Sequence, residues 1–170
     1  MAESNELADI KSFYDLSAKD IDGNVLDFEI FRSQIVVIVN VASHCGYTES
    51  HYTGLVELFD KFSDTHRFVI LAFPCNQFGN QEPDEPSVIK EFAVSKGVKF
   101  TMMQKIDVNG ARTHLVYQFL KKEVGPTTID WNFANYFLVS PDGSISSHSG
   151  VEPSFLQDVV YDLFGKEGEF

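Results

Sequence analysis

The sequence predicts an α/β fold in which helices flank a mixed central sheet and a β-hairpin precedes it. Two continuous apolar runs, at 34–42 and 67–75, are rich in β-branched residues, as in strands that are buried on both faces. An amphipathic stretch from 49 to about 62 separates them, so strand, helix and strand follow one another as in a right-handed parallel crossover. Asp22-Gly23 lies between two half-alternating runs, which is the signal of the hairpin.

The second half of the chain is expected to complete the sheet and its helical cover. Apolar residues recur at helical spacing in three further stretches, near 87–96, over 114–124 and near 153–164. Two short strands are expected at 136–139 and 144–148, on either side of a Pro-Asp-Gly turn. No repeat or linker interrupts the 170 residues, which are enough to bury a core, so we expect a single domain spanning 1–170.

Composition excludes several classes of partner. The formal net charge is −12, from 25 acidic and 13 basic residues, so the surface repels nucleic-acid phosphates and anionic lipid head groups. No stretch approaches the roughly 18 apolar residues of a membrane span, and the first residues lack the basic and apolar regions of a secretion signal. We therefore expect no nucleic-acid partner, no stable membrane insertion and a cytoplasmic location.

The two cysteines, Cys45 and Cys75, are too few for a disulfide scaffold and have no neighbours at zinc spacing. None of the five histidines lies at metal-ligand spacing either, so neither a metal nor a prosthetic cofactor is expected. Cys45 lies between the first buried strand and a helix start, where backbone N–H groups and the helix dipole favour the thiolate. Thr48 is placed to cap that helix. A lone thiolate suits peroxide reduction, and the alternative is a buried structural cysteine.

Three neutral hydrogen-bond donors are candidates to support this thiol. Gln77 follows the second buried strand, whose end meets the Cys45 loop at one sheet edge if the two strands are adjacent. Trp131 and Asn132 offer an indole N–H and an amide that stabilise negative charge without protonating the sulfur. The alternatives are an ordinary turn for Gln77 and Asn132 and a core position for Trp131. His44, next to Cys45, favours the thiolate if its ring turns toward the sulfur.

Three motifs together resemble the glutathione peroxidase family. They are VNVASHCGYT at 39–48, LAFPCNQFG with QEP at 71–83, and WNF at 131–133, and the resemblance covers nearly the whole chain. It implies a thioredoxin-like fold and a thiol-dependent peroxidase of the short-loop, monomeric type, with an antioxidant role against hydrogen peroxide and organic or lipid hydroperoxides. It also implies that Cys45 is the nucleophile, which passes through a sulfenic acid, with Gln77, Trp131 and Asn132 as donors. Cys45 stands where some relatives carry selenocysteine.

The resemblance leaves the reductant open between glutathione and a protein of the thioredoxin or protein disulfide isomerase type. Val94 stands where thioredoxin-dependent relatives carry a resolving cysteine, and Ala134 begins the stretch where glutathione-using relatives often carry a lysine. Cys75 is then the internal candidate for a resolving thiol. The alternative function is therefore a peroxide-driven protein thiol oxidase or redox sensor that relays a Cys45–Cys75 disulfide to a partner. A third hypothesis is a binding module that has lost turnover.

Overall fold

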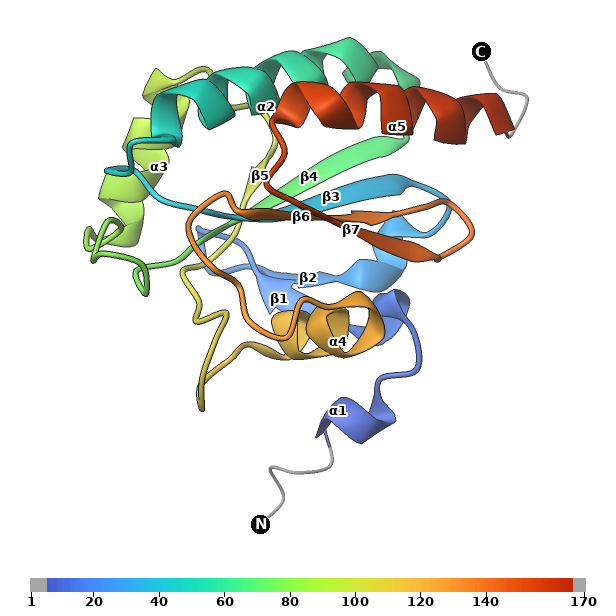
Figure 1. Ribbon diagram of the computed structural model, residues 1–170, viewed down its shortest axis with the longest axis horizontal. Helices are drawn as coiled ribbons and strands as arrows, with labels where there is room; N and C mark the ends of the chain where they lie inside the picture. Colours follow the sequence, from blue (N-terminus) through green and yellow to red (C-terminus); the bar gives the residue numbers. More distant parts are fainter. Residues whose placement is uncertain (1–5, 167–170) are drawn as a thin grey trace.

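A five-stranded mixed sheet lies between two layers of helices in the computed structural model, which describes residues 6–166 (Figure 1). The strand order is β5-β4-β3-β6-β7. Strands β3, β4 and β5 are parallel, whereas β6 runs antiparallel to both β3 and β7. The strands are β3 (Ile35–Val41), β4 (Phe68–Pro74), β5 (Thr101–Met102), β6 (Asn135–Val139) and β7 (Ile145–Ser149).

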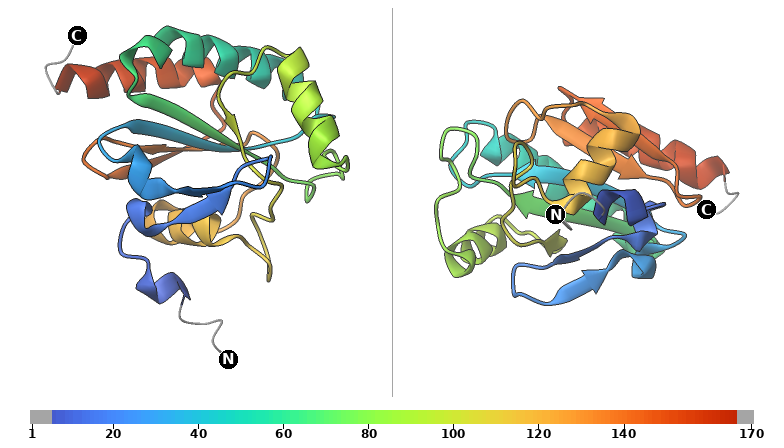
Figure 2. Two further views of the ribbon diagram at one scale, coloured as in Figure 1. Left: turned by 180° about the vertical axis from the view of Figure 1, so that it is seen from behind. Right: turned by 90° about the horizontal axis from the view of Figure 1, so that it is seen from below.

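The helices divide between the two faces of the sheet. One face is covered by α2 (Thr48–Phe62), α3 (Pro86–Ser95) and α5 (Pro153–Lys166). The other is covered by α4 (Leu115–Val124) and by the hairpin of β1 (Ser17–Lys19) and β2 (Val25–Asp27), as the view from behind also shows (Figure 2). The remaining short helices are α1 (Glu6–Asp9) and the 3₁₀ turns Phe13–Asp15, Phe28–Phe31 and Ser63–Thr65.

This arrangement confirms the predicted α/β fold, its mixed sheet and its hairpin. The hairpin turn is closed by Asp20, whose carboxylate accepts the N–H groups of Asp22 and Asn24 at 2.9 Å, while Gly23 adopts a left-handed φ of +88°. The two-residue strand β5 was not predicted, because so short a segment has no readable periodicity. The predicted boundaries at 1 and 170 lie outside the described residues.

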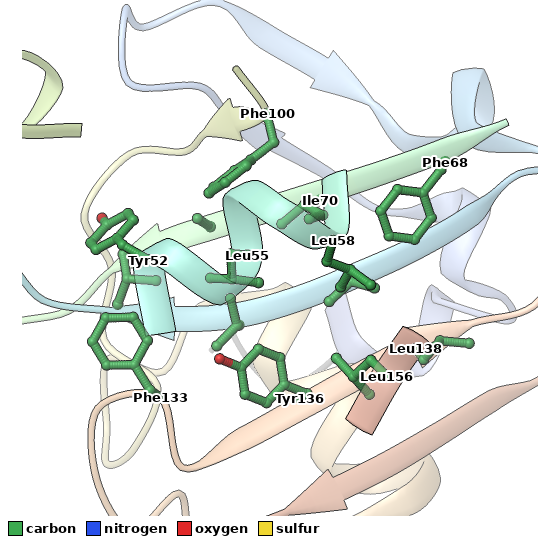
Figure 3. Packing of buried hydrophobic residues seen from close by; sticks show 14 of the residues in the cluster. Tyr52, Leu55, Leu58, Phe68, Ile70, Phe100, Phe133, Tyr136, Leu138 and Leu156 are labelled. Carbon is green, nitrogen blue, oxygen red and sulfur yellow. The ribbon is translucent and has the colours of Figure 1, made fainter. Parts of the chain in front are cut away.

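Alternating side chains of the central strands build two separate cores. Ile35, Val37 and Val39 of β3 point into the first, which lies between the sheet and the helices α2 and α5, and which we call the α2-side core (Figure 3). Val36 and Ile38 point into the second, between the sheet and α4, the α4-side core. Every residue of β3 is buried, as the continuous apolar run predicts.

The parallel pairing of β3 and β4 brings two loops to one edge of the sheet. Val41 lies opposite Pro74 in the register, so both strands end at the same level. The N–H of Cys75 donates to the carbonyl of Val41 at 3.0 Å and extends the pairing by one step. The loop that carries Cys45 and the loop after β4 therefore leave the sheet side by side, as predicted.

The helix α4 begins at a histidine cap, which makes its stability sensitive to pH. Nδ1 of His114 accepts the N–H of Val116 at 3.1 Å, a bond that only an unprotonated Nδ1 makes. Burial lowers the pKa of His114 from its ordinary value of 6.5, so the unfolded chain takes up the proton more readily. The contribution of this cap to the stability of the protein is therefore complete above about pH 6.5, and it is lost as the pH falls through the folded pKa of His114.

We expect His114→Asn, which caps without titrating, to reduce the loss of unfolding free energy between about pH 7 and pH 5. The loss of a cap is worth about 1 kcal/mol, which sets the size of the effect. Urea unfolding at several pH values measures it. An unchanged pH dependence in the variant would show that this cap does not titrate.

Candidate functional site

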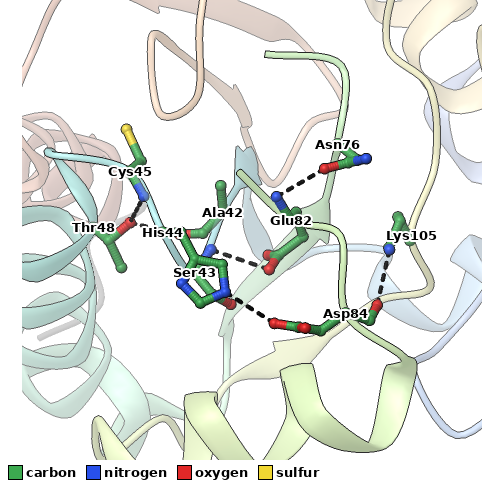
Figure 4. Close-up of polar contacts among 9 residues, drawn as sticks. All are labelled: Ala42, Ser43, His44, Cys45, Thr48, Asn76, Glu82, Asp84 and Lys105. Atoms are coloured by element: carbon green, nitrogen blue, oxygen red, sulfur yellow. Dashed lines mark hydrogen bonds and ion pairs between the residues drawn. The ribbon is translucent and has the colours of Figure 1, made fainter. Parts of the chain in front are cut away.

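Cys45 lies in a tight turn between β3 and α2 and is 9% exposed. Its N–H donates to Oγ1 of Thr48 at 3.1 Å, and the Thr48 hydroxyl donates to the carbonyl of Ala42 at 2.6 Å (Figure 4). The predicted cap of α2 by Thr48 is therefore wrong. Thr48 is the first helical residue, no side chain caps α2, and the hydroxyl closes the Cys45 turn instead.

The sulfur of Cys45 faces the start of the helix. The N–H of Tyr47 donates to Sγ at 3.4 Å, and the helix begins one residue later. The free N–H groups and the dipole of a helix N-terminus favour negative charge at this position. The predicted assistance from His44 does not occur, because its ring turns away from the sulfur and pairs with the carboxylate of Asp84, Nε2 to Oδ2, at 2.9 Å (Figure 4).

A buried glutamate joins the Cys45 loop to the loop after β4. Glu82 is fully buried, and its Oε1 accepts the N–H of Ser43 at 3.1 Å, while its own N–H donates to Oδ1 of Asn76 at 2.9 Å. The N–H of His44 donates to the carbonyl of Gln81 at 3.1 Å and adds a second link between the loops. The second carboxylate oxygen of Glu82 has no protein partner. Burial raises the pKa of Glu82, and the bonds to Ser43 partly offset this.

We expect Glu82→Ala to weaken both the fold and the site, since it leaves the buried N–H of Ser43 without an acceptor. An unsatisfied buried N–H costs about 1–3 kcal/mol. Glu82→Gln keeps an acceptor oxygen and should retain most of the stability. Urea unfolding of the two variants measures the difference, with Glu123→Gln on the exposed surface of α4 as a matched control for the lost charge.

The same variants test the pH dependence. Because the pKa of Glu82 is raised on folding, its contribution is complete below about pH 4.5 and is lost as the pH rises through the folded pKa. Glu82→Gln should lack this loss, and a variant that keeps it would show that the carboxyl is not its source.

The side-chain amide of Gln77 is bonded to the segment before α4 and not to the Cys45 loop, unlike the prediction for this residue. Its Oε1 accepts the N–H groups of Val108 at 2.7 Å and Asn109 at 3.1 Å, and its Nε2 donates to the carbonyl of Asn109 at 2.8 Å. The amide of Gln77 thus connects the loop after β4 to the segment before α4. Its remaining contact is the thiol of Cys75, which donates to Oε1 at 3.5 Å.

A different glutamine of the same loop contacts another predicted site residue. Oε1 of Gln81 accepts Nδ2 of Asn132 at 2.9 Å. Trp131 and Gln81 both pack closely against Gly79. A methyl group added to Gly79 would lie only 3.2 Å from the indole and 3.3 Å from the Gln81 side chain, so the absence of a side chain there permits this close packing. Sequence reasoning missed Gln81 because two glutamines share one irregular loop, and no periodicity tells which of them points to the site.

Trp131 and Asn132 lie at this edge, as predicted. Trp131 is 36% exposed, so it is not a core residue, and its ring packs 5.8 Å from that of Phe78. Asn132 is 1% exposed, and its Oδ1 has no protein partner. Phe133 adopts a left-handed φ of +58° and donates its N–H to the carbonyl of Asn40 in β3 at 2.9 Å. Its ring joins the same core as Cys45, so the segment is held beside the thiol.

Cys75 lies on the opposite face of the sheet from Cys45. Cys45 belongs to the α2-side core, whereas Cys75 is fully buried in the α4-side core. Burial raises the pKa of Cys75, which keeps it a neutral thiol. Both cysteines are free. The structure does not bring Cys75 to the site, so the disulfide relay is not favoured.

Residues 6–166 contain neither a candidate metal site nor a membrane-spanning helix. No group of three or more histidine, cysteine, aspartate or glutamate side chains in this range could hold a metal ion. No helix in the same range is long and apolar enough to cross a membrane.

Comparison with known proteins gives one consistent result. A family model described as "Glutathione peroxidase" matches residues 13–121. The "Glutathione peroxidase-like peroxiredoxin 2" of Saccharomyces cerevisiae is 44% identical over 91% of this chain and 98% of its own length. The "Probable phospholipid hydroperoxide glutathione peroxidase 6, mitochondrial" of Arabidopsis thaliana is 46% identical over 85% of this chain, which spans 62% of that longer relative.

Solved structures agree with the sequence relatives. The crystal structure of Trgpx in its apo form is 32% identical, has a TM-score of 0.74 and covers 91% of this chain and 96% of its own. The structure of dsbF from MTB, at 17% identity and a TM-score of 0.64 over 91% of this chain and 98% of its own, shares the fold alone. These matches confirm the predicted thioredoxin-like fold.

Proposed function

The chain belongs to the glutathione peroxidase family, and from this premise we propose that Cys45 is its peroxide-reducing thiol, with Gln81, Trp131 and Asn132 as the supporting donors. The family membership makes the chain a thiol-dependent peroxidase. One observation supports the choice of Cys45 most strongly: its sulfur accepts a backbone N–H at the start of α2, at the edge where Gln81 meets Asn132.

The oxidation step follows from these positions. The Cys45 thiolate attacks the terminal oxygen of the hydroperoxide, the O–O bond breaks, and the sulfur loses two electrons as it becomes a sulfenic acid. The departing alkoxide takes up a proton and leaves as an alcohol, or as water when the substrate is hydrogen peroxide. Neutral donors suit this step, because the Trp131 indole and the Asn132 and Gln81 amides stabilise developing negative charge without protonating the sulfur.

The reduction step requires a thiol from outside the chain. An external thiol attacks the sulfenic acid, water leaves, and a mixed disulfide forms; a second thiol then releases Cys45 and carries away the disulfide. Cys75 is on the other face of the sheet, and the exposed side chain at 94 on α3 is a valine, so neither supplies this thiol. We propose glutathione or a thioredoxin-type protein as the reductant, and a monomer as the active form.

Turnover distinguishes the reductants. Consumption of cumene hydroperoxide is followed in two coupled assays, one with glutathione and its reductase and one with thioredoxin and its reductase. Steady-state turnover in either assay supports the proposed function, and its absence in both would contradict it. The cytoplasmic location stays a prediction.

A further inference from the structure

A pocket of about 440 Å³ opens beside the candidate site. Its lining residues include Trp131 and Asn132 of the candidate site, together with Tyr47, Phe133 and Val151. Two of its lining residues are neighbours of Cys45, because Tyr47 donates its N–H to the sulfur and Phe133 belongs to the same apolar cluster as Cys45. An aromatic and aliphatic wall of this size favours the apolar body of a small organic molecule.

The charge of this pocket is negative. Glu152 lines it with a carboxylate, and none of its lining residues is a lysine or arginine. His51 also lines it, but its Nδ1 is bonded to the hydroxyl of Tyr136 at 2.6 Å and its Nε2 lies 3.6 Å from Oε2 of Glu152. Burial lowers the pKa of His51, with Glu152 opposing this, so the ring is neutral near pH 7 and leaves the carboxylate uncompensated.

We propose that this pocket receives the organic part of the hydroperoxide and that Glu152 makes it select uncharged organic hydroperoxides over those that carry a carboxylate. The inference rests on the proposed function of Cys45. A ligand carboxylate in the pocket would lie near that of Glu152, and two like charges a few ångströms apart repel even in water. Hydrogen peroxide has no organic part and provides an internal reference for the chemistry at Cys45.

A matched pair of substrates tests the selection. Linoleic acid hydroperoxide and its methyl ester have the same apolar body and differ by one charge. Each is mixed with the reduced protein below its micellar concentration, and oxidation is followed by the fluorescence of Trp131, the single tryptophan of the chain. Every rate is divided by the rate of the same variant with hydrogen peroxide.

The wild-type protein is expected to react faster with the ester than with the acid at low ionic strength. Glu152→Lys, which changes the local charge by two units, should raise the acid-to-ester ratio roughly tenfold, and Glu152→Gln should raise it roughly threefold. Salt at about 1 M should remove most of the difference. Glu123→Lys, the same reversal on the exposed surface of α4, should leave the ratio unchanged.

Filling the pocket gives a second readout. Val151→Phe should lower the ester rate relative to hydrogen peroxide, because the larger ring occupies the space of the substrate. The inference is overturned if the acid-to-ester ratio is the same in the wild type and both Glu152 variants, or if Val151→Phe leaves the ester rate unchanged. An absence of reaction between the wild type and hydrogen peroxide would instead overturn the proposed role of Cys45.

Discussion

Replacing Cys45 with serine is expected to abolish the rapid oxidation of the reduced protein by hydrogen peroxide, with a loss of about a thousandfold or more. A serine hydroxyl stays protonated near neutral pH, so the N–H of Tyr47 and the start of α2 have no thiolate to stabilise. Stopped-flow fluorescence of Trp131 measures the rate, because the indole lies at the same sheet edge and is partly exposed.

Cys75→Ala is the matched control for the loss of a thiol. Cys75 packs in the α4-side core, so its removal should lower stability through lost packing but leave the fast oxidation in place. A fast phase that persists in Cys45→Ser, or that disappears in a folded Cys75→Ala variant, would contradict the assignment of the reaction to Cys45.

The second large effect is expected at Gln81. Gln81→Ala removes the amide that accepts Nδ2 of Asn132 and lies beside Trp131. Loss of one preorganised donor from a site where charge develops lowers the rate about a hundredfold, and the positioning of Asn132 is lost as well. The second-order rate constant for oxidation by hydrogen peroxide is the measurement.

Gln77→Ala is the control within the same loop. Its amide is bonded to Val108 and Asn109, so the variant should unfold at a lower urea concentration while its oxidation rate stays close to that of the wild type. The opposite result, a slow Gln77→Ala and a fast Gln81→Ala, would restore the glutamine that the sequence motif suggested and would contradict the geometry of the site.

The sequence carries enough information to predict the sheet and the position of Cys45. The runs that became β3 and β4 are apolar at every position except Asn40, because both faces of the sheet are covered, and the two parallel strands end at one edge. The order of strand and helix alone therefore predicts that a thiol between them lies at the sheet edge where α/β proteins have their sites.

Side-chain direction inside the loops could not be predicted in the same way. Gln77 and Gln81 are four residues apart in an irregular loop, where no repeating geometry relates sequence position to direction. Thr48 was expected to cap the helix, but its hydroxyl instead donates to the carbonyl of Ala42 and accepts the N–H of Cys45. The buried position of Glu82 is likewise a tertiary effect, because a glutamate in a polar loop is ordinarily exposed.

The position of Cys75 follows from the alternation of side chains along β4. Ile70 and Ala72 of β4 point into the α2-side core, whereas Leu71 and Phe73 point into the α4-side core. Cys75 follows Phe73 by two residues and continues the same alternation. Period-two alternation therefore separates it from Cys45 and explains why the relay between the two thiols is not favoured.

Trapping the oxidised sulfur tests the central claim most directly. The reduced protein is treated with a single equivalent of hydrogen peroxide in the presence of dimedone, which reacts with sulfenic acids, and the adduct is located by peptide mass spectrometry. We expect the adduct on Cys45 and none on Cys75. An adduct on Cys75, or a Cys45–Cys75 disulfide in place of an adduct, would contradict the account.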